Sequence, residues 1–138
     1  MLDAYFTTFA ELRAESTTVV RATAGRAEVE RVNDIPFTLT QVSLNDVIAG
    51  AAPPATFTVS QLGGPDVASP NSSQRLAEQR QYLLFLKPSM TGDPTRFMIT
   101  GDQGVYELTG DTYGFVGATG SALPNSLPAT SATALVKG

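Results

Sequence analysis

The feature that most constrains the fold is a short apolar run, Tyr82-Leu83-Leu84-Phe85-Leu86, which is closely followed by Pro88. A strand with one face in water alternates apolar and polar residues, whereas this run is apolar at every position. Five residues are too few for a typical helix or a membrane span, and proline has no N–H to donate within a sheet. The run therefore predicts a central strand with one face in a core and the other under a helix.

A candidate for the covering helix lies near the start of the chain, where residues 2–15 show helical periodicity. The apolar residues follow the i, i+3, i+4, i+7 spacing and form one stripe: Leu2, Tyr5, Phe6, Phe9 and Leu12. A helix that docks on a sheet is the favoured interpretation of three aromatic residues on one stripe. A groove for a ligand or partner is the alternative.

The chain from about residue 19 to residue 116 is rich in strand-forming patterns separated by turn signals. Asn33-Asp34 predicts a turn, and Gly110-Asp111 predicts a two-residue hairpin because glycine accepts a positive φ. Thr56–Leu62 alternates cleanly, with Phe57 and Val59 directed inward.

A change of side-chain parity marks the strand that follows the first turn. Phe37 and Leu39 fall on one parity, whereas Val42 and Leu44 fall on the other. We interpret both pairs as inward, which predicts a β-bulge near Thr40-Gln41. Bulges of this kind are common where a sheet curls into a barrel.

Composition excludes several classes of function. The chain has 138 residues, no Cys, no His and a net charge of −4. Thiol nucleophiles, thiolate or imidazole metal sites and histidine-based triads are therefore absent. The acidic balance gives no general attraction to nucleic acid. We expect no membrane span in this chain, no cofactor, and a monomer or weak homodimer.

Two local patterns are weaker candidates for sites. Thr-Gly-Asp recurs at 91–93, 100–102 and 109–111, which is either a calcium-binding repeat or, as we favour, a series of turns in a meander. Arg75, Arg80 and Lys87 form at most a small basic spot. No catalytic, cofactor-binding or metal-binding residues are predicted, and no ligand-binding residue is identified. Any active surface is expected in the loops at 63–80, 88–96 and 117–131.

The order of motifs resembles that of a group of exported bacterial proteins of unknown function. The motifs are Val47-Ile48-Ala49-Gly50, Thr56–Gly64, Gln81–Leu86 and Phe97–Tyr106, within residues 18–116. The chain is also distantly similar to the OB-like barrel of netrin and metalloproteinase-inhibitor (NTR-type) domains. That resemblance implies a barrel and export, with a signal or lipid anchor removed before this chain; a cytoplasmic location is the alternative. The inhibitors' N-terminal metal-chelating Cys is missing here, so their mechanism is not carried over.

Together these features predict a single, mainly β domain over residues 1–138, α+β by count. We expect an N-terminal helix at 1–16, a barrel at 17–116, and a loop-rich tail at 117–138, in which Leu135-Val136 is a candidate for a last edge strand. The barrel is expected to be small, antiparallel, partly closed and OB-like, with about five to seven strands and the helix packed on it. The first functional hypothesis is a non-enzymatic, exported or cell-surface module that binds a protein, peptide or small ligand. The alternatives are an accessory domain of an envelope complex and, third, a carboxylate-dependent hydrolase.

Overall fold

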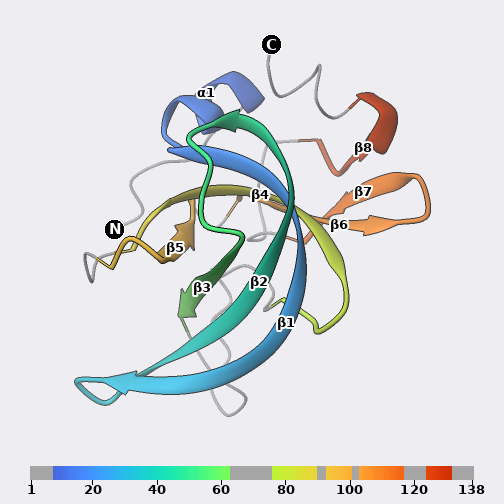
Figure 1. Cartoon of the computed structure of the whole chain (residues 1–138). Helices are drawn as coiled ribbons and strands as arrows, with labels where there is room; N and C mark the ends of the chain where they lie inside the picture. The colour runs from blue at the N-terminus through green and yellow to red at the C-terminus, as the bar shows by residue number, and fades with distance from the viewer. Residues whose placement is uncertain (1–7, 63–75, 90–92, 101–102, 117–123, 132–138) are drawn as a thin grey trace.

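The strands of the protein form one strongly curved sheet with a short helix packed against it (Figure 1). This computed structural model describes residues 8–62, 76–89, 93–100, 103–116 and 124–131. A helical turn at 129–131 ends the last described segment. The elements are α1 (Phe9–Ala14), β1 (Thr18–Val32), β2 (Ile35–Gly50), β3 (Thr56–Leu62), β4 (Gln81–Pro88), β5 (Arg96–Ile99), β6 (Val105–Thr109), β7 (Thr112–Phe115) and β8 (Ser126–Pro128).

Five of the strands close into a ring. The sheet order is β1-β2-β3-β5-β4-β6-β7-β8, and β1 also pairs with β4. The ring therefore runs β1-β2-β3-β5-β4 and back to β1, which is the five-stranded, partly open barrel of an OB-like fold. All of its pairings are antiparallel except that between β3 and β5, which is parallel. The predicted OB-like barrel is confirmed: its ring has five strands, and within the described residues the sheet that contains the ring has eight.

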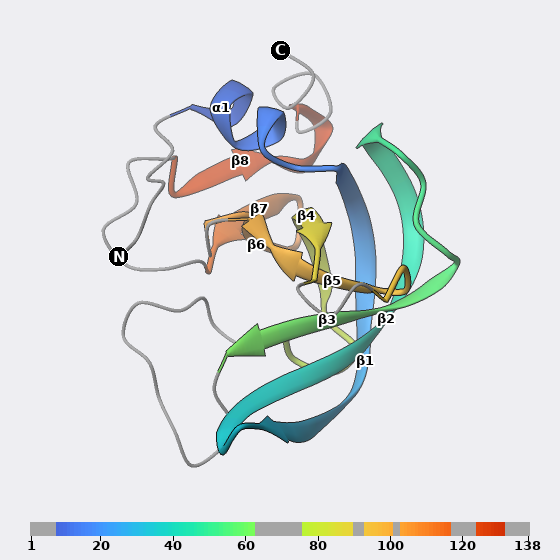
Figure 2. The same ribbon diagram turned by 90° about the vertical axis from the view of Figure 1, so that its left-hand side faces the viewer.

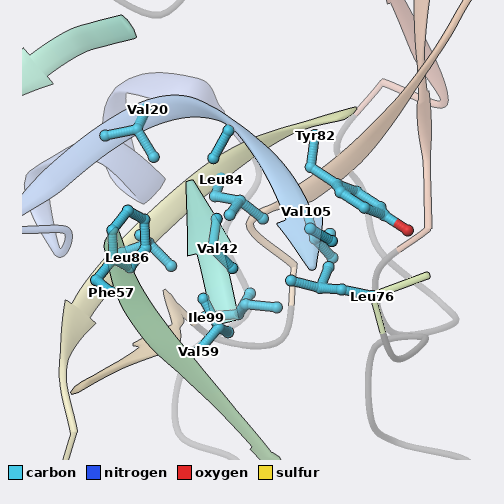
Figure 3. Close-up of a cluster of buried hydrophobic side chains, with 12 residues drawn as sticks. Val20, Val42, Phe57, Val59, Leu76, Tyr82, Leu84, Leu86, Ile99 and Val105 are labelled. Atoms are coloured by element: carbon cyan, nitrogen blue, oxygen red, sulfur yellow. The ribbon is translucent and has the colours of Figure 1, made fainter. Parts of the chain in front are cut away.

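Strand β4 lies at the centre of the molecule, as its sequence predicts. One edge pairs with β1, while the other pairs with β5 and then β6. Tyr82, Leu84 and Leu86 point into the barrel, where they meet residues of the other ring strands (Figure 3). Leu83 and Phe85 point to the opposite face. All five side chains are buried.

Two clusters of buried side chains therefore share β4. The inner cluster fills the barrel and consists of Val20, Ala22, Ala24, Val42, Phe57, Val59, Leu76, Tyr82, Leu84, Leu86, Ile99 and Val105. The outer cluster lies on the other face of β4 and consists of Leu12, Val19, Ile48, Leu83, Phe85, Tyr106, Tyr113 and Leu127.

Helix α1 covers the outer cluster. It begins with a capping box, in which the Thr8 hydroxyl accepts from the Glu11 N–H and the Glu11 carboxylate accepts from the Thr8 N–H. Leu12 is completely buried, and the Phe9 ring stacks on Phe85 with centroids 6.0 Å apart. The predicted helical cover of β4 is confirmed for Phe9 and Leu12. Residues 1–7, which hold the rest of the predicted stripe, lie outside the described part of the chain.

The predicted turns are both present. Asn33 and Asp34 have φ values of 52° and 67°, which is the pattern of a type I′ turn between β1 and β2. Gly110 has a φ of 61° between β6 and β7, where Thr109 pairs with Thr112. Short primed turns of this kind match the twist of the strands they join.

The predicted bulge in the second strand is misplaced. Parity is continuous across this part of β2, with Thr38, Thr40 and Val42 buried on the inner face. Between Ala24 and Ala27, two residues of β1 lie opposite the single β2 residue Gln41, so the extra residue at this point is on β1. The extra residues of β2 lie further along the strand, at Asn45 and Ile48. Leu39 consequently lies on the outer face of the barrel. Its parity was misinterpreted because two threonines occupy the inner positions.

The predicted loop-rich tail also contains structure. Ser126–Pro128 forms β8, which pairs with β7, and Leu127 is buried in the outer cluster. The suggested edge strand at Leu135-Val136 falls outside the described residues.

Candidate functional site

A hollow on the outer face of the barrel combines charged, polar and apolar groups. It has a volume of about 240 Å³ and is lined by Arg26, Ala27, Glu28, Leu39, Gln41, Thr58 and Arg96. These residues come from four neighbouring ring strands, β1, β2, β3 and β5. In the lower half of Figure 2, away from α1, β3 lies beside the hairpin ends of β1 and β2. We call this hollow the strand-face cavity.

The pleat of the strands places the polar lining residues on one face. Gln41 pairs with Thr58, and Thr58 pairs with Arg96, so these three side chains form one row across the sheet. The bulge in β1 brings Arg26 next to this row. Gly25 suits the bulge because a Cβ there would lie 3.2 Å from the carbonyl oxygen of Gln41.

One edge of the cavity is held by ion pairs. Arg96 lies 3.3 Å from the Glu30 carboxylate and 3.9 Å from the Asp93 carboxylate. Asp93 also accepts hydrogen bonds from the Thr95 hydroxyl and N–H, which lower the pKa of the Asp93 carboxyl. These contacts connect the β4–β5 loop to the β1–β2 hairpin.

Two other charged residues of the lining have no such contacts. Arg26 and Glu28 are exposed and have no ion-pair or hydrogen-bond partner within the described ranges. One cation and one anion beside the neutral polar groups of Gln41 and Thr58 suit a polar ligand with groups of both signs. A purely anionic ligand fits poorly because Glu28, Glu30 and Asp93 surround the two guanidinium groups.

A second cavity, of about 350 Å³, lies between α1 and the ends of β1 and β2. Its lining is mostly small, and the hydroxyl groups there already have partners within the protein. Ser16 donates to the carbonyl of Leu12 at 2.7 Å, and Thr18 contacts the carbonyl of Ala49 at 3.4 Å. This cavity therefore offers fewer polar groups for recognition than the strand-face cavity.

The structure separates the residues of the proposed basic spot. Arg80 forms an ion pair with Glu107 at 3.2 Å just before β4, whereas Lys87 lies near the opposite end of that strand. Arg75 lies outside the described residues. These cations therefore do not form a shared patch in the part of the chain that can be described.

The Thr-Gly-Asp motifs that can be described lie in turns, as favoured from the sequence. Asp93 caps its own loop through Thr95, and Gly110-Asp111 forms the turn between β6 and β7. Residues 101–102 lie outside the described part. Across the described ranges, no group of three or more acidic residues is positioned to hold a metal ion.

Where the structure describes the loops expected to form the active surface, they contribute one residue to the cavity lining. Only Arg96, from the segment 88–96, lines it; residues 63–75, 90–92 and 117–123 are outside the described part. The other polar lining groups, Arg26, Glu28, Gln41 and Thr58, lie on strands. They could have been found only as alternate polar positions on strands, a pattern that any solvent-exposed strand face also shows.

Comparison with known proteins assigns this chain to no family. No model of a protein family matches the chain, and no curated protein matches it. Within the described residues, α1 and the other helical segment are too short to cross a membrane.

Proposed function

We propose that this protein is a non-enzymatic binding module that holds a polar ligand or partner in the strand-face cavity. The observation that carries the proposal is the position of the cavity. It lies on the outer face of β2 and β3, next to the loop between β4 and β5, and OB barrels use this face and these loops to bind ligands.

The chemistry of the cavity supports binding rather than catalysis. Its charged groups are the guanidinium groups of Arg26 and Arg96 and the single carboxylate of Glu28, and the pKa of the Asp93 carboxyl, which pairs with Arg96 beside the cavity, is lowered. A carboxylic acid that donates a proton near neutral pH needs a raised pKa instead. The Arg26 and Glu28 side chains are left to pair with a ligand, while Arg96 is positioned by Glu30 and Asp93.

We further propose that the protein acts outside the cytoplasm. The resemblance of residues 18–116 to exported bacterial proteins supports this location. The absence of Cys means that folding needs no disulfide in either compartment. Fractionation of cells that express the full-length gene product tests the location, and recovery of the protein only in the cytoplasm would contradict it.

The binding proposal is tested by titrating ¹⁵N-labelled protein with amino acids, dipeptides, oligosaccharides and nucleotides. We expect saturable amide shifts at Gln41, Thr58 and Arg96 with at least one of these classes. Arg26→Ala should weaken that binding by about tenfold, the size expected for one charge-assisted hydrogen bond. Arg31→Ala is the matched control because Arg31 lies on the same strand but outside the cavity lining. Shifts confined to the cavity beside α1, or no shifts with any class, would overturn the proposal.

A further inference from the structure

The β1–β2 hairpin has a second feature, the outer edge of β1 beyond Ala24. β1 pairs with β4 from Thr18 to Thr23. Ala24 then donates its N–H to the Arg80 carbonyl and accepts from the Gln79 N–H. From residue 26 to residue 32, β2 is the only strand that pairs with β1 in the described ranges. This part of β1 is an edge strand.

The hairpin register determines which backbone groups lie on the open side of that edge. Val32 pairs with Ile35 across a two-residue turn. In such a hairpin the closing pair exchanges hydrogen bonds, and alternate residues of the strand do so thereafter. The remaining residues direct their N–H and C=O groups away from β2. In β1 these are Ala27, Val29 and Arg31, and together they offer a template for another strand.

The side chains on this edge define what such a strand would carry. Glu28 is exposed and has no ion-pair partner within the described ranges, and Glu30, two residues further on the same face, pairs with Arg96 at 3.3 Å. The two arginines of the segment, Arg26 and Arg31, lie near its ends, so its middle carries the two glutamates and Val29. Val29 lies on the other face and is 45% exposed, an uncommon state for a large apolar side chain in this protein. A strand with basic side chains opposite the two glutamates and an apolar side chain opposite Val29 would complement all three.

A second copy of the chain does not meet this requirement. When two copies of this edge pair antiparallel around a two-fold axis, the same face of each sheet points the same way. A residue can then lie opposite only a residue whose side chain is on the same face of the strand. If the two-fold axis passes beside Val29, Glu28 of each copy lies opposite Glu30 of the other. If the axis passes beside either glutamate, that glutamate lies opposite the same glutamate of the other copy. Like charges directly opposite are destabilising. Centring on Ala27 would place the added strand against Gln79, which already occupies that edge at Ala24.

We propose that the outer edge of β1 at residues 26–32 binds an extended basic segment of a partner protein as an added strand. The net charge of −4 favours such a partner. This surface lies beside the strand-face cavity and uses backbone groups, so the proposal does not depend on a ligand in the cavity.

The probe is a short capped peptide of alternating lysine and valine, titrated into ¹⁵N-labelled protein. We expect saturable shifts and slowed amide exchange at Ala27, Val29 and Arg31. The same peptide with glutamate in place of lysine should bind about tenfold more weakly, since attractive cross-strand pairs become repulsive. A peptide N-methylated on its pairing edge should not bind, because it cannot donate to the β1 carbonyls.

Variants of the protein make the test specific. Val29→Pro removes an outward N–H at an edge position where proline is tolerated, and it should abolish binding. Glu28→Lys should reverse the preference between the lysine and glutamate peptides. Asp111→Lys, at the exposed turn between β6 and β7, is the charge-matched control and should change neither.

Several outcomes would overturn the proposal. Equal binding of the N-methylated peptide would show that only charge attraction is measured. Absence of binding would show that the charges of this edge merely protect it from pairing. Shifts at Gln41 and Thr58 without shifts at Val29 would assign the peptide to the cavity instead. If Val29→Pro fails to fold, the N-methylated peptide and Glu28→Lys still decide the question.

Discussion

The two hydrophobic clusters on either face of β4 are built in different ways. The inner cluster is mostly aliphatic and is enclosed by strands of the ring, which pair with one another all the way round. The outer cluster is richer in aromatic residues, and its cover comes from α1 at one end of the chain and β8 near the other. Phe9, Phe85, Tyr106 and Phe115 form a chain of ring contacts there.

This difference indicates how stability is distributed. The ring cannot lose one strand without exposing the whole interior, so the inner cluster should unfold only with the entire domain. The cover of the outer cluster consists of a six-residue helix and a three-residue strand, which can detach while the ring persists. The predictions below probe this contrast, from the largest expected effect to the smallest.

Shortening a β4 side chain on either face should lower the free energy of unfolding by a similar amount. The regions whose backbone amides exchange faster should differ between the two faces. Phe85→Ala should destabilise by about 3–5 kcal/mol and Leu84→Ala by about 2–5 kcal/mol, as for other fully buried side chains. Urea unfolding measures the loss, and native-state hydrogen exchange locates it. Phe85→Ala should speed exchange mainly in α1 and β6–β8, whereas Leu84→Ala should speed it throughout the ring. A loss below about 1 kcal/mol at both sites would show that β4 is not central.

Adding a methyl group behind Phe85 should also destabilise the outer cluster. A Cβ at Gly104 would lie 2.6 Å from the Phe85 Cβ and 2.9 Å from its carbonyl oxygen. Gly104→Ala should therefore cost about 1–3 kcal/mol through forced displacement of β4. Gly114→Ala is the control, because the nearest atom there is 4.0 Å away. Equal denaturation midpoints for the two variants would contradict the close approach of Gly104 to β4.

Removing a buried hydroxyl should stabilise the inner cluster. Thr40 is fully buried, and its hydroxyl oxygen has no hydrogen-bond partner within the described residues. Thr40→Val should therefore raise the free energy of unfolding by about 1 kcal/mol. Thr38→Val is the matched control on the same face, and it should not stabilise because Thr38 has an interaction partner. Stabilisation by Thr38→Val alone would contradict this assignment.

High pH should weaken the outer cluster through Tyr106. Burial raises the pKa of this phenol, which donates to the Pro124 carbonyl at 2.8 Å. In the unfolded chain the pKa of Tyr106 returns to its ordinary value of about 10. Because the folded state binds this proton more tightly, the contribution of Tyr106 to the free energy of unfolding is complete below about pH 10 and declines as the pH rises above it. Tyr106→Phe should lose about 1 kcal/mol at pH 7 but show a shallower decline between pH 9 and about pH 11. Parallel stability curves for the two proteins would contradict a buried, neutral Tyr106.

Much of the fold could be predicted because its signals are local. The continuous apolar run at 82–86 requires two covers, and the stripe of Phe9 and Leu12 supplies one of them. The turns at Asn33-Asp34 and Gly110-Asp111 are specified by residues that accept a positive φ.

The remainder depends on non-local pairing. Sequence periodicity does not show that β1 returns to pair with β4, nor that β3 and β5 run parallel. The bulge was misplaced because Gly25, with no side chain, hides the change of parity in β1. The strand-face cavity was missed because its polar residues look like the solvent-exposed face of any strand, and only the ring brings four strands together around them.

The closure of the ring between β1 and β4 has a consequence for synthesis of the protein. Thr18 pairs with Leu86, and Leu86 is synthesised only after β2, β3 and the segment that follows β3. The pairing of β1 with β4 therefore cannot form before then. Until then the nascent β1–β2 hairpin has an apolar face and an unpaired edge. Contacts so distant in sequence slow folding and prolong exposure of aggregation-prone edges. Of the ring strands, β1 therefore remains longest without its last partner strand.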